Sequence, residues 1–292
     1  MHTRLHGTLL FLSAIFFFAI LDATAKYMSA FFAVPLLVWA RYLVHLVFML
    51  GAVAPGMGRQ IIVTRRPLLM IFRALMLLGC TLFVMLAFRS LPLAETTALV
   101  FVAPLLVALL AGPLLGEKLH YSSWLATITG FGGVLLIARP GGAMFGTGVA
   151  YALAAALCNA IYQLLTRKLS ATEPPMRQLF YTALVGTVSM SFVLPVYWTG
   201  DVPTLQQAVL IISLGLYGGI GHFLFIRAFH EAPASTLSPL LYIQLIWATL
   251  LGWVIFGQLP DLLTAVGMLI IGASSLSLAL RHTRPVIYVE PT

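Results

Sequence analysis

The stretch that decides the fold runs from Thr96 to Gly116 and reads TTALVFVAPLLVALLAGPLLG, without a single charged side chain. A helix that crosses the hydrocarbon core of a bilayer needs about 20 apolar residues. A transmembrane β-strand alternates polar and apolar positions, whereas this stretch is apolar on all sides. It therefore predicts a membrane-spanning helix. Comparable uncharged stretches cover 119–138, 178–200 and 232–260.

The composition extends this prediction to the whole chain. Of its 292 residues, 61% are hydrophobic and 8% are charged, which is too little polar surface to cover a water-soluble globule of this size. Ten spans of about 20 residues each would leave only short connections. We therefore expect an all-α integral membrane protein with ten transmembrane helices. These spans are expected at 7–27, 35–54, 67–89, 93–115, 121–139, 146–167, 177–199, 205–229, 233–256 and 260–280.

The basic residues predict the orientation in the membrane. The net charge of +8 comes from side chains scattered at the ends of segments, which fits membrane topology better than a nucleic-acid partner. With a cytoplasmic N-terminus, twelve basic residues lie on the inner side and four on the outer side. We expect an inner (plasma) membrane protein with both termini cytoplasmic. The inner set is Arg4, Arg59, Arg65, Arg66, Arg73, Lys118, Arg167, Lys168, Arg177, Arg227, Arg281 and Arg284, and the outer set is Lys26, Arg41, Arg89 and Arg139.

A shift of 141 positions aligns the two halves of the sequence. One offset that serves both ends of the halves indicates an internal duplication. We expect a first five-helix repeat at 1–140 and a second at 141–292, ending in a short cytoplasmic tail. Because five is odd, the second repeat enters the membrane from the opposite side and the repeats are inverted. The aligned pairs include Ala19 with Ala160, Ile20 with Ile161, Pro92 with Pro233, Phe101 with Tyr242 and Gly116 with Gly257.

Each half carries a short motif before its fourth helix, AFRSLPLAETT (87–97) and AFHEAPASTLS (228–238). The helix that follows ends in LLGEK (114–118) or IFGQL (255–259). This pattern resembles the drug/metabolite transporter superfamily, more narrowly its EamA-type ten-helix exporters, which include bacterial aromatic amino-acid exporters. The resemblance implies ten helices, an inverted repeat and export of Phe, Tyr, Trp and related compounds.

The second half departs from this pattern at two positions. His230 stands where the first half has Arg89, and Gln258 stands where it has Glu117. The resemblance therefore supports the predicted topology more strongly than the predicted substrate.

Together these features predict a secondary transporter that exports amino acids, preferentially aromatic or apolar ones, by alternating access. The longest connection, 55–66, is too short for a nucleotide-hydrolysing domain, and no catalytic, metal-ligand or cofactor motif is visible. The expected partners are the small-molecule substrate and the lipid bilayer. A monomer suffices, because the two halves complete one another. The alternatives are an efflux carrier of cationic drugs and, in other classes, a membrane-embedded enzyme or a receptor.

The sixth span carries polar side chains that must face the bundle interior, since lipid does not solvate them. Asn159 and Gln163 lie one turn apart, with Tyr162 beside them. Two amides on one helix face could bind the amine and carboxylate of a zwitterion. The alternative is ordinary hydrogen bonding between helices.

The ninth span carries Tyr242, Gln244 and Trp247, and Phe101 is the repeat equivalent of Tyr242. A symmetric pair of rings could sandwich a planar or apolar substrate side chain. We therefore include these four residues among the substrate-binding candidates. Packing between helices is the alternative for each ring.

Pro104 and Pro239 interrupt the fourth and ninth spans, and each removes a backbone donor. Helix breaks at midplane depth are common at binding sites in transporters, although a simple kink would serve packing alone. His222 follows a run of glycines on the eighth span. It is a candidate substrate donor or titrating switch, with helix packing as the alternative.

Asp22 and Lys26 stand four residues apart near the outer end of the first span. We expect them to form a structural or gate ion pair, with proton coupling through Asp22 as the alternative. Arg41 and His45 have the same spacing on the second span, so the charges of these four residues could neutralise one another there. Arg73 is expected to snorkel to the cytoplasmic surface.

Overall fold

The computed structural model describes residues 2–115, 121–139, 146–170, 172–198, 200, 202–231 and 238–281. Every regular element within these ranges is a helix, which confirms the all-α prediction. Six of the described helices are long and apolar enough to cross a membrane, and four shorter apolar helices accompany them. The helices are α1 (His2–Met28), α2 (Val34–Phe48), η1 (Met49–Val53), α3 (Ala54–Met57), η2 (Gly58–Ile61), α4 (Pro67–Phe88), α5 (Leu93–Val100), α6 (Ala103–Leu115), α7 (Tyr121–Ala138), α8 (Thr147–Ser170), α9 (Pro175–Tyr197), α10 (Leu205–Glu231), η3 (Ser238–Tyr242), α12 (Ile243–Phe256) and α13 (Leu262–Arg281).

The expected fourth and ninth spans are not continuous α-helices. α5 and α6 are separated by a turn at 101–102, and a 3-10 helix, η3, precedes α12. Pro104 is the second residue of α6, where its missing N–H leaves no intrahelical hydrogen bond unmade. Pro239 is likewise the second residue of η3. Both spans therefore contain a short piece of backbone that is not α-helical.

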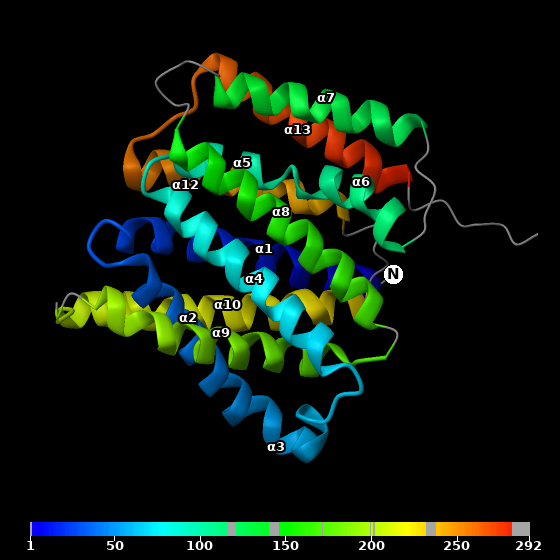
Figure 1. Ribbon diagram of the computed structural model, residues 1–292. Coiled ribbons are helices and arrows are strands. Elements are labelled where there is room, and N and C mark those ends of the chain that lie inside the picture. The colour runs from blue at the N-terminus through cyan, green and yellow to red at the C-terminus, as the bar shows by residue number, and fades with distance from the viewer. Residues whose placement is uncertain are drawn as a thin grey trace, which may run out of the picture.

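Helices from the two halves of the sequence alternate through the bundle. α1 packs along α10, α4 along α8, α2 along α9 and α7 along α13, as Figure 1 shows. Each of these pairs joins one helix from the first half to one from the second. The two halves therefore share one packed interior.

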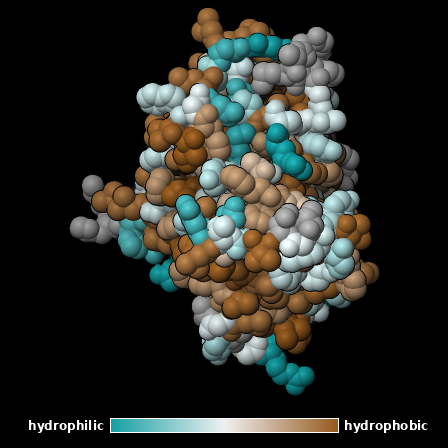
Figure 2. All heavy atoms as spheres, turned by 90° about the vertical axis from the view of Figure 1, so that its left-hand side faces the viewer, coloured by the Kyte–Doolittle hydropathy of each residue, from teal (hydrophilic) through white to brown (hydrophobic). Residues whose placement is uncertain are grey.

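The outside of the bundle is largely apolar. Figure 2 shows hydrophobic side chains over much of the face that it displays, with hydrophilic ones in separate patches. Leu68, Phe192 and Leu269 are each more than 70% exposed. An apolar surface of this extent would be unfavourable in water and fits contact with lipid. The chain is therefore a multi-pass membrane protein.

Glycines on α10 allow α2 to approach closely. A Cβ atom on Gly215 would lie 2.4 Å from Cβ of Val44 and 2.9 Å from the carbonyl oxygen of Arg41. A Cβ atom on Gly218 would meet only ordinary contacts, the nearest at 3.5 Å from Nε of Arg41. Small residues at such positions let transmembrane helices pack backbone to backbone.

An ion pair joins the ends of α7 and α13. The Arg139 guanidinium donates to both carboxylate oxygens of Asp261. Asp261 also accepts a hydrogen bond of 2.9 Å from the backbone N–H of Thr264 and so caps the start of α13. The hydrogen bonds from Arg139 and Thr264 hold the pKa of Asp261 well below its ordinary value.

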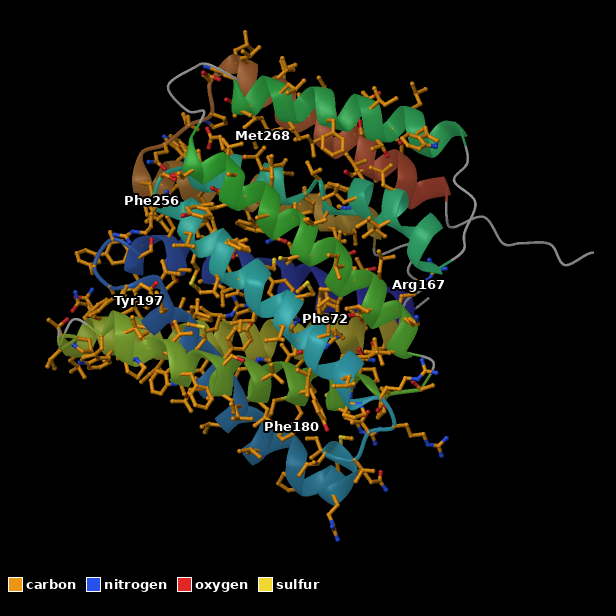
Figure 3. The ribbon with its side chains drawn as sticks, viewed as in Figure 1. Phe72, Arg167, Phe180, Tyr197, Phe256 and Met268 are labelled. Carbon is orange, nitrogen blue, oxygen red and sulfur yellow. The ribbon has the colours of Figure 1, made fainter. Side chains whose placement is uncertain are left out.

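A second polar network ties the connection before α4 to the start of α9. Glu173 accepts hydrogen bonds of 2.6 Å from Thr64 and from Arg177. Burial opposes ionisation of this carboxyl, but these hydrogen bonds prevail and lower its pKa. Phe180, labelled in Figure 3, packs with Ile61 in the neighbouring apolar cluster. The network therefore links the two halves of the chain at the end of the bundle where α9 begins.

We expect Gly215→Ala to destabilise the protein by about 1–3 kcal/mol, because the added methyl group overpacks the contact between α2 and α10. Gly218→Ala is the matched control and should change the free energy of unfolding much less. Thermal melting of both variants in detergent measures the difference. Equal melting temperatures for the two variants would contradict this account of the contact.

We expect the Arg139–Asp261 pair to stabilise the fold in a pH-dependent way. Asp261 stays ionised in the folded protein at lower pH than in the unfolded chain, so its contribution is present above the ordinary pKa of 3.8 and is lost as the pH falls below it. Asp261→Asn should therefore lower the melting temperature at pH 7, and the difference from the unmodified protein should shrink toward pH 3. A difference that stays constant over this range would show that the carboxylate charge is not involved.

Candidate functional site

A cavity of about 270 Å³ lies in the middle of the bundle. Pockets that bind small ligands have volumes of about 300–1,000 Å³, so this one suits a small metabolite. Its wall takes side chains from α1, α2, α4, α5, α6, α8, α10, η3 and α12, and hence from both halves of the sequence. Its charged, hydroxyl, amide and imidazole lining comprises Asp22, Arg41, Thr81, Thr96, Thr97, Asn159, Gln163, His222 and Gln244.

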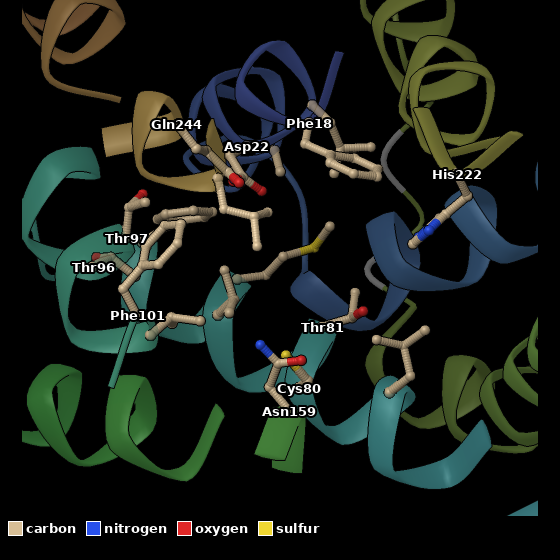
Figure 4. A pocket seen from close by; sticks show the side chains of 18 of the residues that line it. Phe18, Asp22, Cys80, Thr81, Thr96, Thr97, Phe101, Asn159, His222 and Gln244 are labelled. Atoms are coloured by element: carbon tan, nitrogen blue, oxygen red, sulfur yellow. The ribbon is translucent and has the colours of Figure 1, made fainter. Parts of the chain in front are cut away.

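Asp22 on α1 and Gln244 on α12 meet at the cavity wall. The Gln244 amide donates a hydrogen bond of 3.2 Å from Nε2 to Oδ2 of Asp22, and Figure 4 shows the two side chains next to each other. No other hydrogen bond to the Asp22 side chain is present within the described residues. The carboxylate thus keeps acceptor capacity for a further donor in the cavity.

Asn159 and Gln163 both line the cavity from one face of α8. A spacing of four residues places them one turn apart on the same side of the helix. Neither amide forms a hydrogen bond to a described part of the protein. The hydrogen bonding between helices that was the alternative for these residues is therefore not what holds them.

Tyr162 points elsewhere and contacts Arg73 of α4. Arg73 is 2% exposed and lies with its guanidinium carbon 4.5 Å from the centroid of the Tyr162 ring. The prediction that Arg73 reaches the surface is wrong, because the bundle supplies four acceptors that replace water around the guanidinium. These acceptors are the hydroxyl groups of Tyr162 (2.9 Å), Thr166 (2.7 Å) and Thr182 (3.0 Å) and the carbonyl oxygen of Gln178 (3.1 Å).

Phe101 and Tyr242, the repeat-equivalent rings, contact each other with centroids 5.5 Å apart. Phe101 lines the cavity at the turn between α5 and α6, and its carbonyl oxygen accepts a hydrogen bond of 3.1 Å from Ser275. Tyr242 lies behind it, outside the lining. Trp247 packs against Phe16, with ring centroids 4.8 Å apart, and is also outside the lining. Of the predicted rings, Phe101 is the one that reaches the cavity.

Lys26 does not pair with Asp22, since no ion pair joins them among the described side chains. Its ammonium donates to the carbonyl oxygens of Phe88 (2.9 Å) and Leu91 (2.6 Å) instead. Carbonyl groups at the end of a helix have no intrahelical partner and so attract a nearby donor. Lys26 therefore fixes the end of α4, and Asp22 is left facing the cavity.

Arg41 was not among the site residues predicted from the sequence, although it lines the cavity. Arg41 lies about 10 Å along α2 from Val34, where the helix starts. A charged residue this far inside a span is the signal that could have identified Arg41 as a site residue. The structure contains no ion pair between Arg41 and any described carboxylate. Its guanidinium carbon lies 5.8 Å from the centroid of the Tyr42 ring.

The cavity offers binding groups of several kinds. Asp22 can bind a cation, Arg41 can bind an anion, and free amides and the Phe101 ring complete the wall. No group of three His, Cys, Asp or Glu side chains within the described ranges could hold a metal ion. The arrangement is suited to holding a small molecule that carries both charges.

We expect Arg73→Gln to lower the free energy of unfolding by about 1.5–3 kcal/mol, because hydrogen bonds to a charged group are lost and buried acceptors remain unpaired. Arg59→Gln, at an exposed position, is the matched control and should have little effect. Chemical denaturation in detergent measures both. Equal stabilities would show that the contacts of Arg73 do not support the bundle.

Comparisons with known proteins agree with this architecture. The model of the EamA-like transporter family matches the chain twice, over residues 5–139 and 146–280. A solved crystal structure aligns with a TM-score of 0.66 at 21% identity and covers 95% of this chain and 99% of its own chain. This structural likeness concerns the fold.

Several curated relatives are transporters. An S-adenosylmethionine uptake transporter of Rickettsia bellii is 30% identical over 215 residues, which is 73% of each chain. A riboflavin transporter of Vibrio cholerae is 28% identical and covers 95% of this chain and 92% of its own length. A pseudopaline exporter of Pseudomonas aeruginosa is 25% identical, with 94% and 95% covered. These matches confirm the resemblance to the drug/metabolite transporters: the chain is a membrane transporter for small metabolites, not an enzyme, and it belongs to the EamA-like transporter family.

Proposed function

We propose that the chain is a secondary transporter that exports amino acids, preferentially those with aromatic or apolar side chains, by alternating access. The observation that carries this proposal is the cavity between the halves. Its wall combines opposite charges, free amides and an aromatic ring within about 270 Å³. A small zwitterion with an apolar side chain matches that combination in size and in charge.

An amino acid can satisfy the polar groups that the protein leaves open. The substrate ammonium can donate to Asp22 and to the amide oxygen of Gln244, in charge-assisted hydrogen bonds. The amides of Asn159 and Gln163 can donate to the substrate from α8. The Phe101 ring can stack against an aromatic side chain in an offset or edge-to-face arrangement.

The proposed topology is ten spans in two inverted repeats, 1–140 and 141–292, with both termini cytoplasmic in the bacterial inner membrane. The double match to the family model supports the duplication. The packing supports the inversion, because the shift of 141 maps α1 onto α8 and α4 onto α10. The contact between α1 and α10 therefore corresponds to the contact between α8 and α4, and both contacts are present. A two-fold axis that relates the repeats requires this correspondence. A monomer is sufficient for this arrangement.

S-adenosylmethionine uptake is the second candidate. Similarity to the rickettsial transporters favours it, and this compound carries an α-amino acid group together with a purine ring. The same polar groups could therefore bind either substrate. Efflux of cationic drugs fits less well, because Arg41 places a positive charge at the cavity wall.

Proteoliposomes preloaded with radiolabelled phenylalanine test the proposal. We expect efflux from vesicles that contain the protein, and a rate about 2- to 10-fold lower for Asn159→Ala and Gln244→Ala, because each loses a hydrogen bond worth about 0.5–1.5 kcal/mol. Gln207→Ala makes the same truncation outside the cavity, where Gln207 pairs with Thr204, and should transport normally.

Parallel vesicles loaded with S-adenosylmethionine or a cationic dye distinguish the alternatives. Movement of S-adenosylmethionine without phenylalanine would replace the first proposal with the second. Movement of the dye alone would contradict both.

A further inference from the structure

The cavity wall contains a cation that forms no ion pair with a described residue. Arg41 lines the cavity, and no described carboxylate lies within ion-pair distance of its guanidinium. A charge inside a membrane protein is costly unless it is paired or serves a ligand. Arg73 shows how the same bundle treats a structural arginine, since it surrounds that guanidinium with four acceptors. Arg41 has no such surroundings and is available to an anion.

Two imidazoles lie beside this cation. His222 of α10 lines the cavity, and the ring of His45 on α2 is nearly parallel to it, at 7° and a centroid distance of 6.2 Å. His45 is 5% exposed, and its Nε2 atom has no hydrogen-bond partner among the described residues. His45 is not part of the cavity lining, so it supports His222 from outside the lining.

The glycines of α10 bring these three side chains together. Nε of Arg41 lies 3.5 Å from the position that a Cβ on Gly218 would take. Cδ2 of His45 lies 3.6 Å from the corresponding position on Gly219. α2 thus lies directly against α10, and its basic side chains share one wall with His222. The glycine run has a role in building the site as well as in packing.

The acidic group of the cavity lining is Asp22. In Figure 4, Asp22 and Gln244 lie on one side of Phe18 and His222 lies on the other. The Phe18 ring contacts the His222 ring edge-on, with centroids 4.9 Å apart. Asp22 and His222 are therefore on different sides of Phe18, and a zwitterion bound between them would have a preferred direction. The Arg41 charge acts on Asp22 across the cavity, although the two form no ion pair.

We infer that Arg41 and His222, supported from behind by His45, form the subsite that binds the carboxylate of the substrate, while Asp22 binds its ammonium group. The inference rests on the proposed transport of amino acids and assigns the orientation of the substrate. A planar guanidinium matches a carboxylate with two parallel hydrogen bonds. A doubly charged anion such as phosphate is disfavoured, because Asp22 faces the same cavity.

Analogues that lack one charge test this orientation. Uptake of labelled phenylalanine into proteoliposomes is measured in competition with phenethylamine, which lacks the carboxylate, and with 3-phenylpropionate, which lacks the amine. We expect Arg41→Gln to weaken competition by unlabelled phenylalanine by about tenfold or more and to leave competition by phenethylamine unchanged, because only phenylalanine loses a charge-assisted contact.

Asp22→Asn should give the converse result, with competition by phenylalanine weakened and competition by 3-phenylpropionate retained. Arg59→Gln, at an exposed position outside the cavity lining, is the matched control for removal of a charge. It should preserve the preference for phenylalanine over phenethylamine and over 3-phenylpropionate. Arg41→Lys keeps the charge without the planar fork and should show an intermediate loss, which provides a second test if Arg41→Gln does not fold.

The outcomes separate the two levels of the proposal. If the unmodified protein carries phenylalanine and the Arg41 variants keep its full preference for phenylalanine over phenethylamine, the orientation is wrong and the transport function stands. If the unmodified protein carries no amino acid, the proposed function fails and the orientation fails with it.

Discussion

The rest of the structure depends on one constraint, which is that the lipid interior offers no hydrogen-bond partners. Every polar group in a span must therefore be satisfied inside the bundle or by something that the bundle holds. The bundle itself satisfies Arg73 and Lys26, because hydroxyl and carbonyl oxygens accept hydrogen bonds from their charged groups. The described part of the bundle does not satisfy Arg41 and Asn159 in this way, although both line a cavity. Polar side chains without a hydrogen-bond partner in the bundle therefore indicate the site more clearly than any sequence motif does.

The cavity exists because of how the halves pack. α1 packs against α10 and α4 against α8, and all four of these long helices contribute side chains to the cavity wall. The fourth span (α5–α6) and the ninth span (η3–α12) are not continuous α-helices. They line the cavity with a turn and a 3-10 helix, respectively. Since the long helices are paired across the halves, a relative motion of the halves would change access to the cavity. Under the proposed alternating access, substrate binding and helix movement would therefore use the same interface.

The sequence could predict the helical class and most helix positions, because apolar length alone determines them. It could also identify Asn159 and Gln163 as inward-facing, since amides avoid lipid. It could not separate Tyr162 from them, because neighbouring residues on a helix point about 100° apart and only the packing shows which direction faces the cavity. Arg41 was missed for a related reason. Its place near the charges of the first span suggested neutralisation at the outer end of the bundle, whereas its position at the cavity depends on packing against α10, far along the chain.

The central claim is that the cavity between the halves binds an amino acid. The most direct measurement is an experimental structure of the protein with 4-bromophenylalanine, in which bromine is located by its anomalous scattering. The account predicts a bromine peak inside the cavity, with the carboxylate density toward Arg41 and the amine toward Asp22. A peak outside the cavity, or ligand density there with the opposite orientation, would contradict it.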